Sequence, residues 1–203
     1  NYSKRVHSDP SIIIFTIYNI LISKASEKED LIIGFPILGE MGNDTEISKH
    51  LNFIINRLPI RNKIEKGKTF SYLLNEVKHK VLEAFRNQNY PISELYFELD
   101  IDHDPSYSFL FNLAFSWFNK KTEKRKEKST VGTYVFENRK VLFDIFFKGT
   151  EAKNKFNISI EYSTLLFKKS TIIRFKERFL TLIDDILKND EKKIEDIEIF
   201  FPD

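Results

Sequence analysis

The sequence contains no cysteine among its 203 residues, and only six glycines and six prolines. The absence of cysteine excludes a disulfide framework, a thiolate metal site and a cysteine nucleophile. Lysine and arginine number 32 against 30 acidic residues, so no overall electrostatic field favours nucleic acid or an anionic membrane. We therefore expect neither nucleic acid nor a membrane among the partners.

Long apolar runs are also missing. The longest one near the start, Ser11 to Ile22, is interrupted by Thr16 and Asn19 and is too short to span a bilayer. It lacks a small-residue cleavage site, so it does not resemble a signal peptide. These two absences predict a cytoplasmic protein. Because the sequence opens with Asn1 rather than methionine, we expect it to be cut from something longer.

Apolar side chains are plentiful, since 41% of the residues are hydrophobic and phenylalanine alone occurs 20 times. A chain of this length and composition can build a sizeable core, and we therefore expect a globular rather than a disordered protein. No cluster of glycine and proline marks a linker between domains. The sequence thus predicts one domain over residues 1–203, with no internal boundary.

Helical periodicity occurs in three segments. Residues 9–26 predict a mostly buried helix that begins with a capping side chain at Ser8-Asp9 and a proline in its first turn. Thr69 is placed to cap a second helix, and Ser170 a third. The apolar positions of the last two helices are Phe70, Leu73, Leu74, Val77, Val81, Leu82 and Phe85, then Ile172, Phe175, Phe179, Leu182, Ile183 and Ile186.

Strand patterns lie between the helices. They cover Leu31 to Leu38, Leu51 to Arg61, Phe109 to Phe118, Val141 to Phe147 and Phe156 to Tyr162. The third alternates most clearly, with Phe109, Phe111, Leu113, Phe115 and Trp117 on one face. Because strands and helices interleave throughout, the sequence predicts an α/β layered sandwich with one main sheet.

No catalytic or metal-binding cluster emerges from the residue pattern. The four histidines, His7, His50, His79 and His103, lie far apart in the sequence and each is more often structural than a ligand. The motifs of zinc proteases, serine hydrolases and nucleotide-binding loops are absent. We therefore predict no catalytic residue and no metal site in this chain.

Two charged segments have a functional and a structural interpretation. Asp100, Asp102 and Asp104 alternate as in a calcium loop, but the central glycine and the later glutamate of that loop are missing. Residues 119–129 are rich in lysine, as a basic patch that binds nucleic acid would be. Their lysines are mixed with glutamates, however, and they carry no aromatic side chain for stacking on bases. We interpret both as solvated loops.

Five stretches, in order, resemble motifs in the C-terminal part of nonribosomal peptide synthetase condensation domains. They are Asp30 to Gly39 (DLIIGFPILG, similar to D-vvvG-x-P-xx-G), Asn52 to Arg61 (NFIINRLPIR, similar to G-x-FVNTLPLR), Asn87 to Leu95 (NQNYPISEL, similar to HQDxPFEkL), Asp104 to Phe115 (similar to D-x-S-R-N-P-L-F-x-x-x-F), and Phe143-Asp144 with Glu161 to Phe167 (similar to FDL and eYnTdLF). The match covers nearly the whole chain. Asn52, Arg57 and Phe109 depart from the usual glycine, threonine and proline, so details of the substrate channel cannot be carried over.

The resemblance implies a fold and a reaction. Family members have two lobes, each resembling chloramphenicol acetyltransferase, with a reaction tunnel between them. The chain would be the C-terminal lobe, with a mixed β-sheet flanked by helices, and the catalytic histidine motif HHxxxDG belongs to the N-terminal lobe. The intact domain would join a donor acyl or peptidyl thioester to an acceptor amine, each on the phosphopantetheine arm of a peptidyl carrier protein.

The resemblance also selects candidate site residues. Asn56 and Arg61 carry polar groups that need partners when they are partly buried, and Gln88 and Tyr90 lie in the turn that ends the second helix. For all four, a tunnel-lining role and a purely structural role remain open. The residues after Trp117 up to about Val141 are the candidate for a segment that crosses to the other lobe.

Three classes of function follow from these observations. The first is one noncatalytic half of a condensation enzyme, inactive as an isolated fragment. The second is a binding module that docks a carrier protein without chemistry. The third is a lobe of a related enzyme, either an epimerization domain or a coenzyme A-dependent acyltransferase, and NFIINRLPIR follows the condensation form more closely than the epimerization form.

Overall fold

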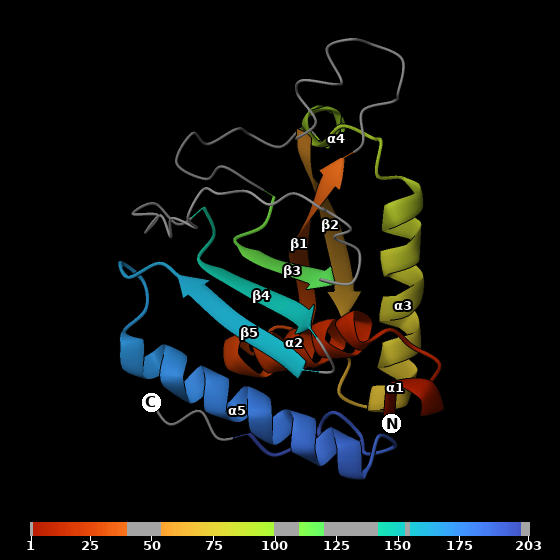
Figure 1. The fold of residues 1–203 in the computed structure, drawn as a ribbon, viewed down its shortest axis with the longest axis vertical. Coiled ribbons are helices and arrows are strands. Elements are labelled where there is room, and N and C mark those ends of the chain that lie inside the picture. The colour runs from red at the N-terminus through yellow and green to blue at the C-terminus, as the bar shows by residue number, and fades with distance from the viewer. Residues whose placement is uncertain (1, 40–53, 100–109, 120–141, 153–154, 200–203) are drawn as a thin grey trace, which may run out of the picture.

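The computed structural model describes residues 2–39, 54–99, 110–119, 142–152 and 155–199. It folds into a five-stranded sheet flanked by helices (Figure 1). In chain order the elements are α1 (Tyr2–Arg5), α2 (Pro10–Ser26), β1 (Asp30–Gly39), β2 (Ile54–Lys63), α3 (Phe70–Arg86), α4 (Ile92–Glu98), β3 (Leu113–Asn119), β4 (Ile145–Ala152), β5 (Lys155–Tyr162) and α5 (Lys169–Lys188). None of the described helices is both long and apolar enough to cross a membrane.

The strand order in the sheet is β2-β1-β3-β4-β5. The two outer pairs, β1 with β2 and β4 with β5, are antiparallel, whereas β3 runs parallel to both β1 and β4. Parallel neighbours require crossover connections, and such central strands are buried on both faces. The predicted α/β class with one mixed sheet flanked by helices is therefore confirmed.

Helix α2 begins where its capping signals predict. The side chain of Asp9 accepts a hydrogen bond from the backbone N–H of Ser11 at 2.8 Å, and Pro10 occupies the first turn. The helix ends at Glu27, which adopts a left-handed conformation with φ of 56°. The predicted helix over residues 9–26 is confirmed.

Helix α3 is capped by Thr69, as predicted. Its side-chain oxygen accepts a hydrogen bond from the backbone N–H of Tyr72 at 3.3 Å. The apolar face is buried from Phe70 to Val81. The assignment of Leu82 to that face is wrong, because its side chain is 45% exposed.

Helix α5 begins earlier than its predicted cap. Lys168 occupies the N-cap position without a side-chain hydrogen bond, and Ser170 lies inside the first turn, so the predicted cap at Ser170 is wrong. The predicted apolar stripe is otherwise confirmed, with Ile183 only partly buried. The buried members are Ile172, Phe175, Phe179, Leu182 and Ile186.

Two strands start later than the apolar patterns predict. Strand β3 begins at Leu113 rather than Phe109, and β4 begins at Ile145 rather than Val141. Phe111 and Phe143 are nevertheless buried, at 4% and 5% exposure. Their burial comes from packing against each other outside the strand ladder, which is why a hydrophobic pattern alone extended the strands too far.

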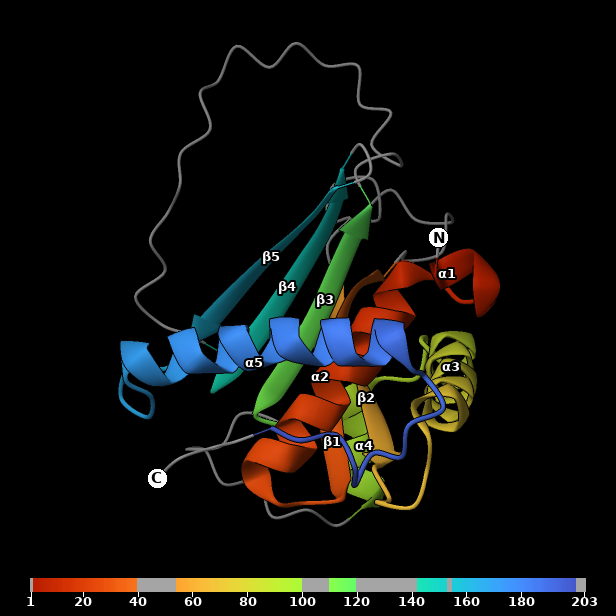
Figure 2. The ribbon, with the colours of Figure 1, turned by 90° about the horizontal axis from the view of Figure 1, so that it is seen from below.

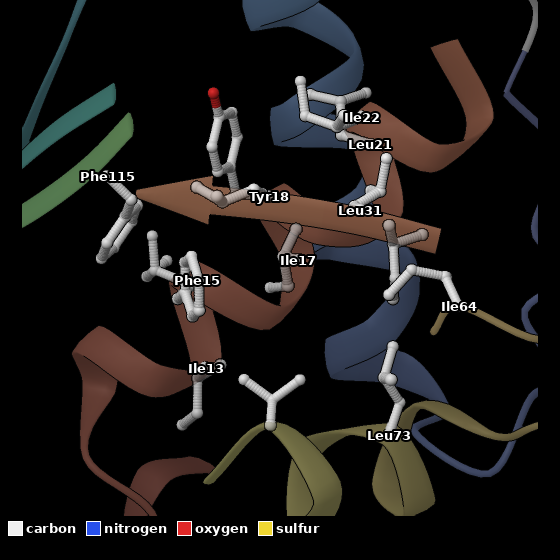
Figure 3. Close-up of a cluster of buried hydrophobic side chains, with 14 of the residues drawn as sticks. Ile13, Phe15, Ile17, Tyr18, Leu21, Ile22, Leu31, Ile64, Leu73 and Phe115 are labelled. Atoms are coloured by element: carbon white, nitrogen blue, oxygen red, sulfur yellow. The ribbon is translucent and has the colours of Figure 1, made fainter. Parts of the chain in front are cut away.

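The main core lies on one face of the sheet, which we call the helix face. Helix α2 lies between α3 and α5 there (Figure 2), and Phe15 and Tyr18 of α2 are fully buried against Phe115 and Phe147 of the sheet. Figure 3 shows these α2 side chains converging with residues of β1, β3 and α3. After α5 the chain returns to the start of α3, where the N–H of Ile194 donates to the carbonyl of Lys68 at 2.9 Å.

Several predicted segments lie outside the described residues. These are the acidic loop at Asp100 to Asp104, the charged loop beyond Asn119, and most of the candidate crossing segment that ends near Val141. The first three positions of the strand predicted at Leu51 to Arg61 also lie outside them, and β2 begins at Ile54. Their interpretations stay predictions.

Candidate functional site

The face of the sheet opposite α2 and α5 collects most of the motif residues. Partners in register lie on the same face of a sheet, and successive residues alternate between faces. The register Gly34–Pro59, Gly34–Ala114 and Ala114–Phe146 therefore defines a second face. Its positions include Asp30, Ile32, Gly34, Pro36, Arg57, Pro59, Arg61, Lys63, Ala114, Ser116, Phe118, Phe146, Lys148, Thr150, Asn157, Ser159 and Glu161.

An aromatic cluster covers the middle of the second face. The rings of Phe111 and Phe143 stack with centroids 6.0 Å apart, and Phe143 meets Phe146 edge to face at 5.4 Å. The ring of Phe111 lies so close to Gly34 that a Cβ at this position would be 1.8 Å from its Cε2 atom. Three of the matched motifs thus meet here, and glycine is required at residue 34 because Phe111 fills the space of a side chain.

The short helix α4 joins this aromatic cluster to the turn after α3. The hydroxyl oxygen of Tyr96 accepts a hydrogen bond from the backbone N–H of Leu110 at 2.6 Å. Ile92 and Leu110 pack against the cluster of Phe111, Ala114 and Phe143. The segment similar to HQDxPFEkL is therefore connected directly to the segment that carries Phe111.

Arg61, a predicted site residue, forms a bidentate ion pair with Asp30. Its Nε and Nη2 atoms donate to the two carboxylate oxygens at 2.9 and 2.7 Å across the β1–β2 pair. The hydrogen bond to Arg61 lowers the pKa of the Asp30 carboxyl. Both side chains are exposed, so the pair links the aspartate of one motif to the arginine of the next on the sheet surface.

This ion pair predicts a pH-dependent contribution to stability. Because the folded-state pKa of Asp30 is depressed, the contribution is present above the unfolded-state pKa and is lost as the pH falls through the folded-state pKa. We expect Asp30→Asn to lower the urea midpoint at pH 7 by a small amount that shrinks toward pH 3 and in high salt. The matched control is Asp184→Asn, at an exposed aspartate of α5 for which the described residues show no ion pair. An equal decrease of the urea midpoint in both variants at pH 7 would contradict a stabilising role of the Asp30–Arg61 ion pair.

Asn56 and Arg61 occupy opposite sides of β2. Asn56 pairs with Ile37 in the register, and Arg61 pairs with Ile32. Successive residues of a strand point to opposite faces, so two positions separated by an odd number, here five, lie on different faces. Of the two predicted residues, only Arg61 is at a second-face position, and Arg57 shares that face with it.

Gln88 and Tyr90 lie in the turn between α3 and α4, as the sequence predicts. The N–H of Gln88 donates to the carbonyl of Phe85, and the N–H of Tyr90 donates to that of Asn87 at 3.0 Å. The side chain of Tyr90 is 42% exposed, and desolvation followed by a hydrogen bond with Glu98 raises its pKa. The turn and the Asp30–Arg61 pair are not joined by a described contact, so the four predicted residues do not form one cluster.

The sequence did not reveal the polar groups that the strand register brings to this face. Lys148 forms an ion pair with Glu161, and its ammonium lies 4.6 Å from the ring centroid of Phe146. Ser116, in register with Lys148, is 2% exposed, and its hydroxyl has no hydrogen-bond partner within the described part of the chain. Only the strand pairing, which no local pattern contains, could have placed these groups together.

The described residues contain no constellation for covalent or metal chemistry. No group of three histidine, aspartate or glutamate residues among them could hold a metal ion. Of the histidines, only His7 and His79 lie in the described ranges, and both are exposed, with a His79 ring nitrogen 2.8 Å from the carbonyl oxygen of Asn75. The second face consists of a buried aromatic centre at Phe111 and Phe143, with partly exposed apolar and charged side chains such as Phe146 and Lys148 beside it.

Comparison with known proteins identifies the family. The sequence model described as the condensation domain matches residues 4–202. The chain belongs to the condensation-domain family. Tyrocidine synthase 3 of Brevibacillus parabrevis is 33% identical over 195 residues, which are 95% of this chain and 3% of that protein.

Two solved structures, an X-domain and a nonribosomal peptide synthetase, contain the fold of this chain. The X-domain from teicoplanin biosynthesis superposes with a TM-score of 0.80 at 16% identity, over 98% of this chain and 46% of that one. A four-domain nonribosomal peptide synthetase bound to AMP and glycine gives a TM-score of 0.77 at 15% identity, over 92% of this chain and 15% of that one. The chain spans less than half the length of each of these proteins.

Proposed function

We propose that the chain is the C-terminal lobe of a condensation domain that forms amide bonds in nonribosomal peptide synthesis. Its second face would form one wall of a reaction tunnel, and an N-terminal lobe bearing HHxxxDG would complete the site. The observation that carries this proposal is the meeting of motif residues on the second face: Gly34, Phe111 and Phe143 converge there, although none of them can act as an acid or base.

The proposed reaction is acyl transfer between two tethered substrates. The acceptor amine attacks the carbonyl carbon of the donor thioester, the carbon–sulfur bond breaks, and the proton lost by the amine is balanced by protonation of the thiolate that leaves. Both substrates would be carried by the phosphopantetheine arms of peptidyl carrier proteins, which supply the thiols. Holding two reactants in the correct geometry can lower the barrier by roughly 7–11 kcal/mol.

In this reaction the chain's own residues would position substrates and exclude water. The stacked rings of Phe111 and Phe143 give the wall a rigid apolar centre. Lys148, Glu161 and Ser116 add polar groups beside it. The exposed surface around this face would also contribute to docking of the carrier proteins.

An amide-formation assay tests the proposal. Purified chain is mixed with one carrier protein loaded with an aminoacyl donor and a second loaded with an acceptor, and an intact condensation domain with its own carriers sets the reference rate. We expect the chain alone to give no dipeptide above the rate without protein, because in this proposal the catalytic histidine of HHxxxDG belongs to the N-terminal lobe. Carriers that lack phosphopantetheine provide the blank. Product from the chain alone at a rate comparable to the intact domain would overturn the proposal.

A further inference from the structure

Strand β5 is an exposed edge of the sheet. Within the described part of the chain it pairs with β4 alone, and it is the last strand in the order (Figure 1). Phe156 and Ile158 are 49% and 36% exposed, and no other described strand pairs with this edge. An edge strand offers a row of backbone N–H and C=O groups that another extended chain can pair with.

An apolar groove runs along this edge, between β5 and α5. Its cavity volume is about 290 Å³. Ile173 and Leu180, on the side of α5 that lines it, are 47% and 49% exposed. The groove is lined by Ile158, Ile160, Tyr162, Lys169, Ile172, Ile173, Lys176, Phe179 and Leu180.

Among the described residues that line the groove, the charged ones are Lys169 and Lys176. Neither forms an ion pair with any other described residue. A ligand with acidic side chains would complement them. A second copy of the chain paired edge to edge would instead bring two further lysines of the same kind to this surface, which disfavours that occupant.

We propose that the β5 edge and the β5–α5 groove bind an extended peptide segment by strand addition. The backbone of the segment continues the sheet beyond β5, since an edge strand can template another strand. Its alternate side chains are apolar and enter the groove, and acidic side chains on the same face reach Lys169 and Lys176. This interaction is separate from the second face, and it holds whether or not the proposed condensation activity does.

Binding of a designed peptide tests this proposal. The probe is a capped seven-residue peptide with glutamate at positions one and seven, valine at positions three and five, and threonine at positions two, four and six. The glutamates and valines therefore share one face of a strand. We expect saturable binding by fluorescence anisotropy, with amide NMR shifts concentrated in β5 and α5. Leu180→Glu and Lys176→Glu are each expected to weaken binding about tenfold.

Matched controls separate the groove from general surface effects. Leu187→Glu changes a residue of α5 that is 43% exposed but does not line the groove, and it should leave binding unchanged. A peptide with lysine in place of glutamate should bind about tenfold more weakly. Methylation of both the threonine and the valine nitrogens should abolish binding if the backbone pairs with β5, because one of these two alternating sets of N–H groups must face that strand.

Four results would overturn the proposal. They are no saturable binding of the glutamate peptide at millimolar concentration, undiminished binding by both Leu180→Glu and Lys176→Glu, undiminished binding of the methylated peptide, and self-association of the chain that is lost in Leu180→Glu. The last result would assign the groove to a second copy. Circular dichroism of each variant confirms that the comparison is between folded proteins.

Discussion

Replacing Gly34 with alanine is expected to lower the free energy of unfolding by about 2 kcal/mol, because overpacking a filled site typically costs 1–3 kcal/mol. The new Cβ would lie 1.8 Å from Cε2 of Phe111, so the ring must leave its position. Displacing it also separates the stacked pair that Phe111 forms with Phe143 on the second face. Urea denaturation followed by circular dichroism measures the change.

A double-mutant cycle shows whether Phe111 is the cause. In the Phe111→Ala background the methyl group of Gly34→Ala has space, so the second substitution should cost far less than it does in the parent chain. The matched control is Gly67→Ala, since a Cβ at Gly67 meets no atom within 4 Å and the residue does not have a positive φ. Additive losses in the cycle, or equal losses at the two glycines, would contradict the predicted contact.

Replacing Phe115 with alanine is expected to lower the free energy of unfolding by about 3–5 kcal/mol, the usual cost of truncating a buried phenylalanine. This is a large part of the roughly 5–15 kcal/mol that stabilises a typical domain. Phe115 is fully buried, and its ring lies 4.9 Å from that of Phe15 and 5.6 Å from that of Phe147. Loss of this residue therefore loosens α2 from the two central strands.

Phe118 provides the comparison on the same strand. Its side chain is 54% exposed, so Phe118→Ala should change the free energy of unfolding by less than about 0.5 kcal/mol. Thermal and urea unfolding of both variants, under the same conditions, measure the difference. Similar decreases in the free energy of unfolding for the two variants would contradict the burial of Phe115 in the core.

Sequence periodicity predicted α3 and α5 well because the burial of these two helices is one-sided, whereas the short helices α1 and α4 were not predicted. The stripe on α5 and the buried face of α3 follow a 3.6-residue period that is visible without any knowledge of the partners. The errors are at helix ends and margins. Ser170 has the side chain of a cap, but the helix begins one residue earlier at Lys169, and Leu82 has the right spacing but faces solvent.

The second face could not be predicted in the same way. Asp30 and Arg61 are 31 residues apart and meet only because β1 and β2 pair in one register. Gly34 and Phe111 are farther apart still, and their contact depends on the parallel placement of β3 beside β1. The family motifs indicated that Gly34 and Phe111 are important. The physical reason, that the ring of Phe111 occupies the space of a side chain at residue 34, could be found only from the fold.

The central claim is that the second face, and not the helix face, meets a partner lobe. The absence of native cysteine allows a direct measurement, because a single introduced thiol reports its own accessibility. Lys148→Cys places the thiol on the second face and Lys176→Cys places it on α5. Maleimide labelling of each variant is timed with and without an HHxxxDG-bearing N-terminal lobe of a condensation domain, the partner that we propose. We predict slower labelling at residue 148 and an unchanged rate at residue 176, and slower labelling at residue 176 alone would contradict the account.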